Sequence, residues 1–117
     1  MTRKNFRIKK YRDKFFKLKE IPPIGMLVVY YPSYDTMIYL IHDGAYANYR
    51  FKPGDIMTIK KVEKHLRYNI IYVKENKCLF TPAELIPAYL VEEQDRKELV
   101  RIFKLKNKVS LDVNFSS

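Results

Sequence analysis

One cysteine and two histidines are the side chains of this chain best suited to metal binding or nucleophilic chemistry. They are Cys78, His42 and His65, and neither histidine has another histidine or the cysteine three or four residues away. A zinc site needs four ligands at short spacings, and a catalytic thiol needs an activating base. The spacing therefore predicts neither a metal site nor a nucleophile, and Cys78 is interpreted as a structural residue of its strand.

Other enzyme signatures are equally sparse. The three glycines, Gly25, Gly44 and Gly54, are too scattered to form a phosphate-binding loop. Two carboxylates, Asp35 and Asp43, flank one predicted strand, but aspartates in such positions are usually turn formers. We therefore expect a protein that is not an enzyme, with no cofactor and no small-molecule substrate.

Binding chemistry is better represented, because the chain contains ten tyrosines and 23 Lys and Arg against 13 Asp and Glu. Aromatic rings interleaved with cations suit single-stranded nucleic acid, where each stacked base contributes about 1–3 kcal/mol. The same mixture suits a protein interface, because Tyr and Arg are enriched among interface hot spots. The candidate contacts to a protein partner are Tyr34, Tyr46 and Tyr49. The candidate nucleic-acid contacts in the middle of the chain are Lys60, Lys61, Lys64 and Arg67.

The first 20 residues hold most of the formal net charge of +10, with nine basic residues against two acidic ones. Tyr11, Phe15 and Leu18 fit one face of a helix, although Phe16 and Leu18 also fit strand alternation. The segment is interpreted as an amphipathic element with a solvated basic face or as a contact to a polyanion. A membrane-surface helix is disfavoured, because the apolar face is short and lacks Trp. The candidate phosphate contacts here are Arg3, Lys4, Arg7, Lys9, Lys10, Arg12, Lys14 and Lys17.

A length of 117 residues suits one domain with short extensions, and 47% hydrophobic residues are enough for a core. A single cysteine fits a reducing compartment. No apolar run of 7–15 residues follows the basic N-terminus, and the longest apolar stretch, residues 25–31, is too short to span a bilayer. We expect a cytoplasmic protein, in the host cytoplasm if the source is viral.

Short strands separated by turn signals are predicted downstream of the Pro- and Gly-containing segment 21–25. The strands cover 26–31, 36–41, 55–62, 67–74 and 77–80, and 86–91 returns to extended structure. The strand over 55–62 is expected to alternate, with Met57, Ile59 and Lys61 on one face. Thr81 and Glu84 form a predicted capping box that opens one helical turn.

The C-terminal part has a different pattern. Residues 92–106 are predicted as an amphipathic helix with Leu99 and Phe103 on its apolar face. The apolar residues of 109–115 alternate strictly with polar ones, which predicts a half-buried strand after a turn at 106–108.

The segment from Phe51 to Met57, with Lys52, a Pro-Gly turn and Asp55 leading into a strand, resembles the corresponding part of Src-homology-three-like barrels. An aromatic-rich strand (68–72), a short hairpin, another strand and a helical turn (81–87) follow in the same order. The resemblance covers residues 26–91 and implies a small barrel. Peptide-binding members of that family use a Trp that this chain lacks, so binding of Pro-rich peptides is not expected.

The sequence thus predicts a mainly β, α+β protein: a basic arm (1–20), a small barrel core (21–91) and a C-terminal extension packed on it (92–117). We expect a basic nucleic-acid-binding accessory or regulatory protein whose arm makes sequence-independent phosphate contacts. The alternative is a protein–protein interaction module, such as a phage regulator that docks on a host enzyme, with an acidic surface as its partner. The chain is rich in Lys, Ile, Asn and Tyr, a composition that suits an AT-rich genome such as many phages have.

Overall fold

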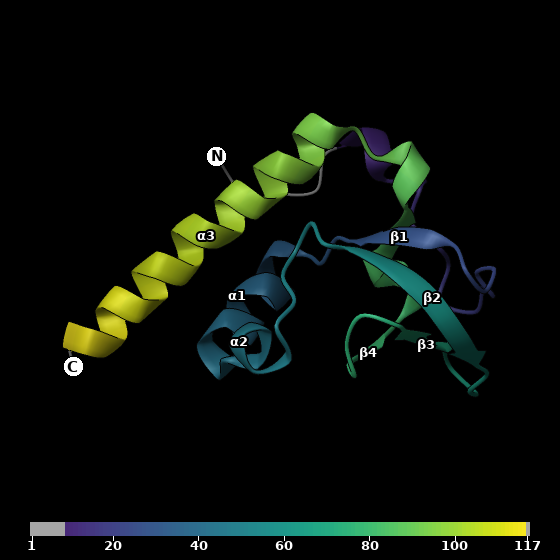
Figure 1. Cartoon of the computed structure of the whole chain (residues 1–117), viewed down its shortest axis with the longest axis horizontal. Coiled ribbons are helices and arrows are strands. Elements are labelled where there is room, and N and C mark those ends of the chain that lie inside the picture. Colours follow the sequence, from purple (N-terminus) through teal and green to yellow (C-terminus); the bar gives the residue numbers. More distant parts are fainter. Residues whose placement is uncertain (1–8, 117) are drawn as a thin grey trace.

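A five-stranded antiparallel sheet forms the centre of the computed structural model, which describes the backbone of residues 9–116 and the side chains of residues 10–108 (Figure 1). The strands lie in the order β4-β3-β2-β1-β5, and β4 and β5 are its two edges. The sheet is therefore open rather than closed into a barrel, and the protein is a small α+β fold. The strands are β1 (Leu27–Tyr30), β2 (Ile56–Glu63), β3 (Ile70–Val73), β4 (Leu79–Phe80) and β5 (Leu85–Pro87).

Strand β2 carries the one departure from regular alternation in its pairing with β3. The register shifts between Ile59 and Lys61, so that one extra residue, Lys60, is accommodated in β2. Such a bulge changes which side chains face the core. Ile59 is buried and Val62 is half-buried, while Lys60 and Lys61 are both exposed. The predicted alternation, with Lys61 on the buried face, is therefore wrong beyond Ile59.

The predicted strand over 36–41 is also wrong, because this segment belongs to helix α1 (Tyr34–Asp43). The hydroxyl of Ser33 accepts a hydrogen bond from the amide of Thr36 and caps the helix. Met37 and Ile41, one turn apart, are both buried. Gly44 ends the helix with φ of 76°, where a glycine is favoured, and its amide donates to the carbonyl of Ile41. Helix α2 (Ala45–Tyr49) follows directly.

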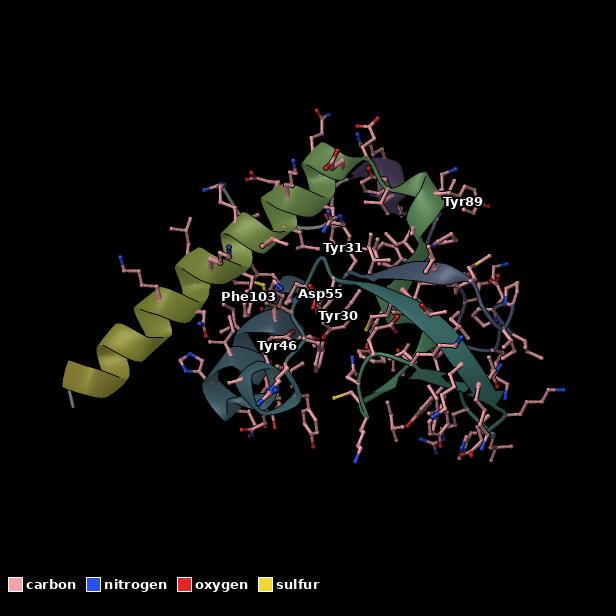
Figure 2. All side chains as sticks on the ribbon, in the orientation of Figure 1. Tyr30, Tyr31, Tyr46, Asp55, Tyr89 and Phe103 are labelled. Atoms are coloured by element: carbon pink, nitrogen blue, oxygen red, sulfur yellow. The ribbon has the colours of Figure 1, made fainter. Side chains whose placement is uncertain are left out.

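Five aromatic rings join the sheet to the helices. They belong to β1, α2, β4, α3 and the segment before β2, and their neighbouring centroids lie 5.2 to 5.4 Å apart with the rings edge to face. The rings are Tyr30, Tyr46, Phe51, Phe80 and Phe103. Figure 2 labels three of them where the sheet meets the helices. The hydroxyl groups of Tyr30 and Tyr46 lie 3.1 Å apart, and burial raises the pKa of both.

Two short 3-10 turns flank the last strand: η3 (Pro82–Glu84) and η4 (Ala88–Leu90). The predicted helical turn before the last strand is confirmed, but the capping box is wrong. The Thr81 side chain accepts no capping hydrogen bond from η3. The amide of Glu84 donates instead to the backbone carbonyl of Thr81.

A single helix, α3 (Glu93–Ser116), forms the C-terminal part and lies against α1 (Figure 1). The predicted apolar face is confirmed, since Leu99 and Phe103 are buried. The predicted turn at 106–108 and strand over 109–115 are wrong. No Pro or Gly follows Glu93, so nothing in the sequence stops the helix once packing of its first half has nucleated it.

The described residues of the N-terminal segment do not form the predicted helix. A 3-10 turn, η2 (Lys9–Tyr11), is followed by turns, and Tyr11 and Phe16 are buried in the core. The amide of Phe16 donates to the carbonyl of Leu85, and the carbonyl of Leu18 accepts from the amide of Asn69. These tertiary contacts outweigh a weak local helix propensity. The segment thereby bridges β5 and the start of β3.

Candidate nucleic-acid interface

The four basic residues predicted in the middle of the chain lie at the end of the β2–β3 hairpin, in β2 and in the loop after it. They are Lys60, Lys61, Lys64 and Arg67, and all four are exposed. We call them the hairpin surface. Lys60, Lys64 and Arg67 make no ion pair with any described residue, so their charges face solvent without compensation.

Glu63 lies within the hairpin surface and compensates part of its charge. Its carboxylate is 2.5 Å from His65 Nε2, 3.6 Å from Lys61 Nζ and accepts a hydrogen bond from the hydroxyl of Tyr72. The hydrogen bond from His65 is the main reason that the pKa of Glu63 is lowered. The ammonium of Lys61 also lies 5.1 Å from the ring centroid of Tyr72. Of the four cations, Lys61 therefore has the most interactions with described residues, an ion pair with Glu63 and a cation–π contact with Tyr72.

The N-terminal segment reaches this surface. Lys19 donates to the carbonyls of His65 and Leu66, and the side-chain amide of Asn69 donates to the carbonyls of Lys19 and Glu20 at 3.0 and 2.9 Å. Asn69 is 2% exposed, and its Oδ1 is a buried polar atom without a hydrogen-bond partner in the described residues. The structure thus brings the N-terminal segment to the hairpin surface at Lys19 and Glu20. The predicted arm residue Lys17 is exposed and lies two residues before Lys19 in the chain.

Lys10 has a different position. Its ammonium lies 2.8 Å from carboxylate oxygens of both Glu92 and Asp95, and the hydroxyl of Tyr11 donates to Asp95 at 2.5 Å. The hydrogen bond with Asp95 raises the pKa of Lys10, and the same contact lowers the pKa of Asp95. Lys10 therefore fastens the segment to the start of α3 rather than facing a ligand.

The other predicted arm residues divide into two groups. Arg12, Lys14 and Lys17 are exposed and form no ion pair with a described residue. Four lie wholly or in their side chains outside the described residues, so their predicted phosphate contacts have no structural description. These are Arg3, Lys4, Arg7 and Lys9.

The three tyrosines predicted to contact a protein partner do not share one exposed patch. Tyr46 is 4% exposed and belongs to the aromatic core, which explains its place in the sequence without a partner. Tyr34 is half-buried, with the ammonium of Lys106 5.6 Å from its ring centroid. Tyr49 is 49% exposed, and its ring packs against Phe51.

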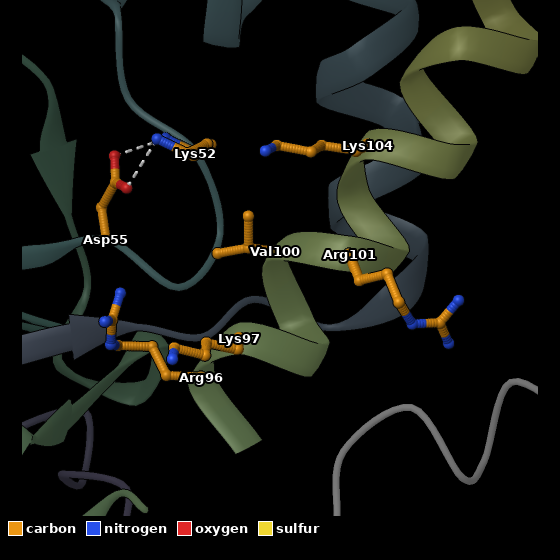
Figure 3. A pocket seen from close by; sticks show the side chains of 7 residues that line it. All are labelled: Lys52, Asp55, Arg96, Lys97, Val100, Arg101 and Lys104. Carbon is orange, nitrogen blue, oxygen red and sulfur yellow. Dashed lines mark hydrogen bonds and ion pairs between the residues drawn. The ribbon is translucent and has the colours of Figure 1, made fainter. Parts of the chain in front are cut away.

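A basic groove between α3 and the turn before β2 was missed by the sequence reasoning. It has a volume of about 420 Å³ and is shown in Figure 3. Its polar lining residues are Lys52, Asp55, Arg96, Lys97, Arg101 and Lys104, and Val100 forms an apolar part of its wall. A second hollow of about 300 Å³ shares Lys52 and adds Arg50, Phe51, Phe103 and Asn107. We call the two hollows together the α3 groove.

A signal for the α3 groove was present in the sequence. Arg96, Val100 and Lys104 recur every four residues, so they share one face of any helix over this range. What the sequence could not supply was the position of Lys52, because only the folded chain places that turn against α3. The apolar residues that the pattern predicts on this helix, Leu99 and Phe103, lie on its buried side and not on the side that lines the groove.

The single cysteine, Cys78, lies between β3 and β4. Cys78 is half-buried, and burial raises the pKa of its thiol, which disfavours the reactive thiolate. In the described part of the chain, no three His, Cys, Asp or Glu side chains gather as a metal site. Over the same residues, no helix is long and apolar enough to cross a membrane.

A comparison with models of known families, with curated proteins and with solved structures finds no match.

Proposed function

We propose that this protein is a non-enzymatic nucleic-acid-binding protein that contacts phosphates largely without regard to sequence. The observation that carries the proposal is the hairpin surface, where Lys60, Lys64 and Arg67 are exposed and uncompensated by described carboxylates. Lys17 of the N-terminal segment is likewise exposed without an ion pair to a described residue, two residues before Lys19, which bonds to this surface. Clustered cations on a fixed backbone gain affinity for a polyanion by releasing its condensed counterions.

The chemistry of this surface favours phosphate over base recognition. Lysine ammonium groups are point charges on flexible stems, whereas base recognition typically uses bidentate Arg, Asn or Gln side chains held in a groove. Three of the four cations named above are lysines.

The strand order, with a 3-10 turn between the two edge strands, supports the further proposal that residues 26–91 form an open variant of a Src-homology-three-like barrel.

The test is fluorescence anisotropy with labelled single- and double-stranded oligonucleotides over a salt series. For a duplex, log K falls against log salt with a slope of about −0.9 per phosphate contact. Replacing Lys64→Ala and Arg67→Ala together is expected to reduce the steepness of that slope by roughly 1.8. A matched control is the pair Lys74→Ala and Lys77→Ala, which removes the same charge from exposed positions between β3 and β4.

The two outcomes separate cleanly. The proposal stands if the Lys64→Ala, Arg67→Ala variant binds the oligonucleotides more weakly and with a shallower salt dependence. The Lys74→Ala, Lys77→Ala control must keep the affinity and the salt dependence of the wild type. Binding that is absent at low salt, or that does not change with salt, would contradict it. The protein–protein alternative would then be tested with Tyr49→Ala, since Tyr49 is the most exposed of the three candidate tyrosines.

A further inference from the structure

We propose that the α3 groove is a second site, one that takes a single-stranded nucleic acid with its phosphates along α3 and a base in the hollow beyond Lys52. The inference rests on the proposed function, but it concerns residues that the hairpin surface does not include. The polar lining of the larger hollow holds five cations and one carboxylate. An anion is attracted by those charges that no carboxylate already compensates.

Three of the five cations that line the larger hollow have a carboxylate partner. Lys52 Nζ lies 3.1 Å from the Asp55 carboxylate, and Lys97 Nζ lies 3.4 Å from the Glu93 carboxylate. Arg101 forms a bidentate ion pair with Glu98. Figure 3 shows Arg101 directed away from Lys52 and Asp55. These cations are therefore held in place and partly neutralised.

Three cations of the α3 groove have no such carboxylate among the described residues: Arg50, Arg96 and Lys104. Within the described part of the chain, the Arg96 guanidinium donates to the carbonyl of Gly54, at 3.4 Å, and to no carboxylate. The side chain of Lys104 points across the groove toward Lys52 in Figure 3. An anion between these elements would meet charge that the protein itself leaves uncompensated, in a concave setting where such charge attracts more strongly than on an open surface.

The turn that forms the opposite wall is fixed in place. The amide of Lys52 donates to the Asp55 carboxylate at 2.9 Å, and the amide of Asp55 donates to the carbonyl of Lys52 at 3.1 Å. Gly54 packs directly against α3, because a Cβ at this position would lie 2.7 Å from Val100 Cγ2. The two walls are therefore preorganised, and a ligand does not have to order them.

The length of the groove suits more than one phosphate. Arg96 and Lys104 are eight residues apart on α3, which corresponds to about 12 Å along the helix axis. Even when the phosphates of an extended single strand are spaced well beyond the roughly 3.4 Å axial rise of B-form DNA, two can lie over this distance. The groove is thus long enough to contact more than one phosphate of a strand.

The second hollow distinguishes a single strand from a duplex. Its walls include the rings of Phe51 and Phe103 together with the guanidinium of Arg50 and the amide of Asn107. Phe51 and Phe103 are 7% and 8% exposed, so they offer a base only a small apolar floor, with hydrogen-bonding groups at its edge. The open ring surface on which a base can stack is that of Tyr49, which is 49% exposed and next to Arg50 in the chain. A duplex keeps its bases stacked inside the helix and cannot offer one to this hollow.

The experiment compares a labelled 12-nucleotide single strand with the duplex of the same sequence, using the full chain. Replacing Arg50→Ala and Lys104→Ala together removes two cations that have no described ion-pair partner, so thermal unfolding should be unchanged. For the single strand, the loss of two contacts at about 0.7 in slope each gives roughly a 25-fold weaker affinity at 0.1 M salt. Duplex affinity should fall by much less, and the Lys74→Ala, Lys77→Ala control should match the wild type with both ligands.

Each other outcome has a distinct meaning. If the groove variant binds the single strand as the wild type does while the Lys64→Ala, Arg67→Ala variant is weakened, the groove is not a site and the proposed function stands. Equal losses for single strand and duplex would overturn the preference for a single strand. If the wild type binds neither ligand, the proposed function fails, and this inference fails with it.

Discussion

At the scale of single residues, Gly54 decides how closely the turn before β2 approaches α3. Its φ of 94° lies in the left-handed region, and an added Cβ would be 2.7 Å from Val100 Cγ2 and 3.1 Å from the carbonyl oxygen of Arg96. Any side chain introduced at position 54 would therefore meet both backbone strain and steric overlap. A change here affects the wall of the α3 groove as well as the free energy of unfolding.

We predict that Gly54→Ala destabilises the protein by about 2–4 kcal/mol, from roughly 1 kcal/mol of left-handed strain plus the cost of overpacking. Gly25→Ala is the matched control, because Gly25 has φ of 87° but nothing within 4 Å of an added Cβ. That variant should lose only about 1 kcal/mol. Urea unfolding measures both, and equal losses in the two variants would show that the contact with Val100 contributes nothing.

At the scale of elements, the caps distinguish two positions that look alike in the sequence. Ser33 and Thr81 each precede a short helical segment by one residue. Only Ser33 uses its hydroxyl as a cap, accepting from the amide of Thr36 at 3.2 Å. The hydrogen-bonding state of one helix end thus differs from the other despite similar residue types.

Ser33→Ala is expected to lower the free energy of unfolding by about 1 kcal/mol, because the amide of Thr36 loses its partner. Thr81→Ala should change it by less than about 0.5 kcal/mol. Chemical denaturation of the two variants side by side provides the check. A larger effect at Thr81 would contradict the assignment of the caps.

The strands could be predicted because their residues carry two consistent signals, β-branched or aromatic side chains and flanking turn formers. The segment 36–41 has the same apolar residue types, and its helical state depends on the Ser33 cap and on burial of Met37 and Ile41 against the rest of the fold. The alternating apolar residues of 109–115 fit a strand locally. Tertiary packing of Leu99 and Phe103 continues the preceding helix through them instead.

The candidate site could be predicted only in part, for a related reason. Lys60, Lys64 and Arg67 are close in sequence, so their common location follows from one hairpin. The α3 groove joins Lys52 to Lys104 across half the chain, and no periodicity reports such a contact. The sequence predicts Tyr46 as a binding residue because composition alone does not distinguish an exposed tyrosine from one packed in an aromatic core.

At the scale of the whole molecule, the basic N-terminal segment is part of the folded body from residue 10 to residue 20. Tyr11 and Phe16 are buried, and backbone hydrogen bonds tie the segment to β5 and to the residue before β3. Charge and core packing therefore come from the same stretch of chain. A deletion removes both at once.

We predict that deletion of residues 1–20 lowers the free energy of unfolding by about 4 kcal/mol or more, since two buried aromatic side chains are lost. The melting temperature should fall by about 10 °C or more. The control, Arg12→Ala with Lys14→Ala, removes two exposed charges and retains both buried rings, so its melting temperature should match that of the wild type. A deletion variant as stable as the full chain would contradict this account.

The buried hydroxyl pair of Tyr30 and Tyr46 has a spectroscopic consequence. Burial raises the pKa of both phenols, so they stay protonated in the folded protein above the ordinary value of 10.0 and ionise near that value only in the unfolded chain. Their contribution to stability is complete below that pH and declines as the solution becomes more alkaline. Of the ultraviolet absorbance that tyrosinate formation gives across the ten tyrosines, the part contributed by these two phenols is therefore an intrinsic optical reporter of alkaline unfolding.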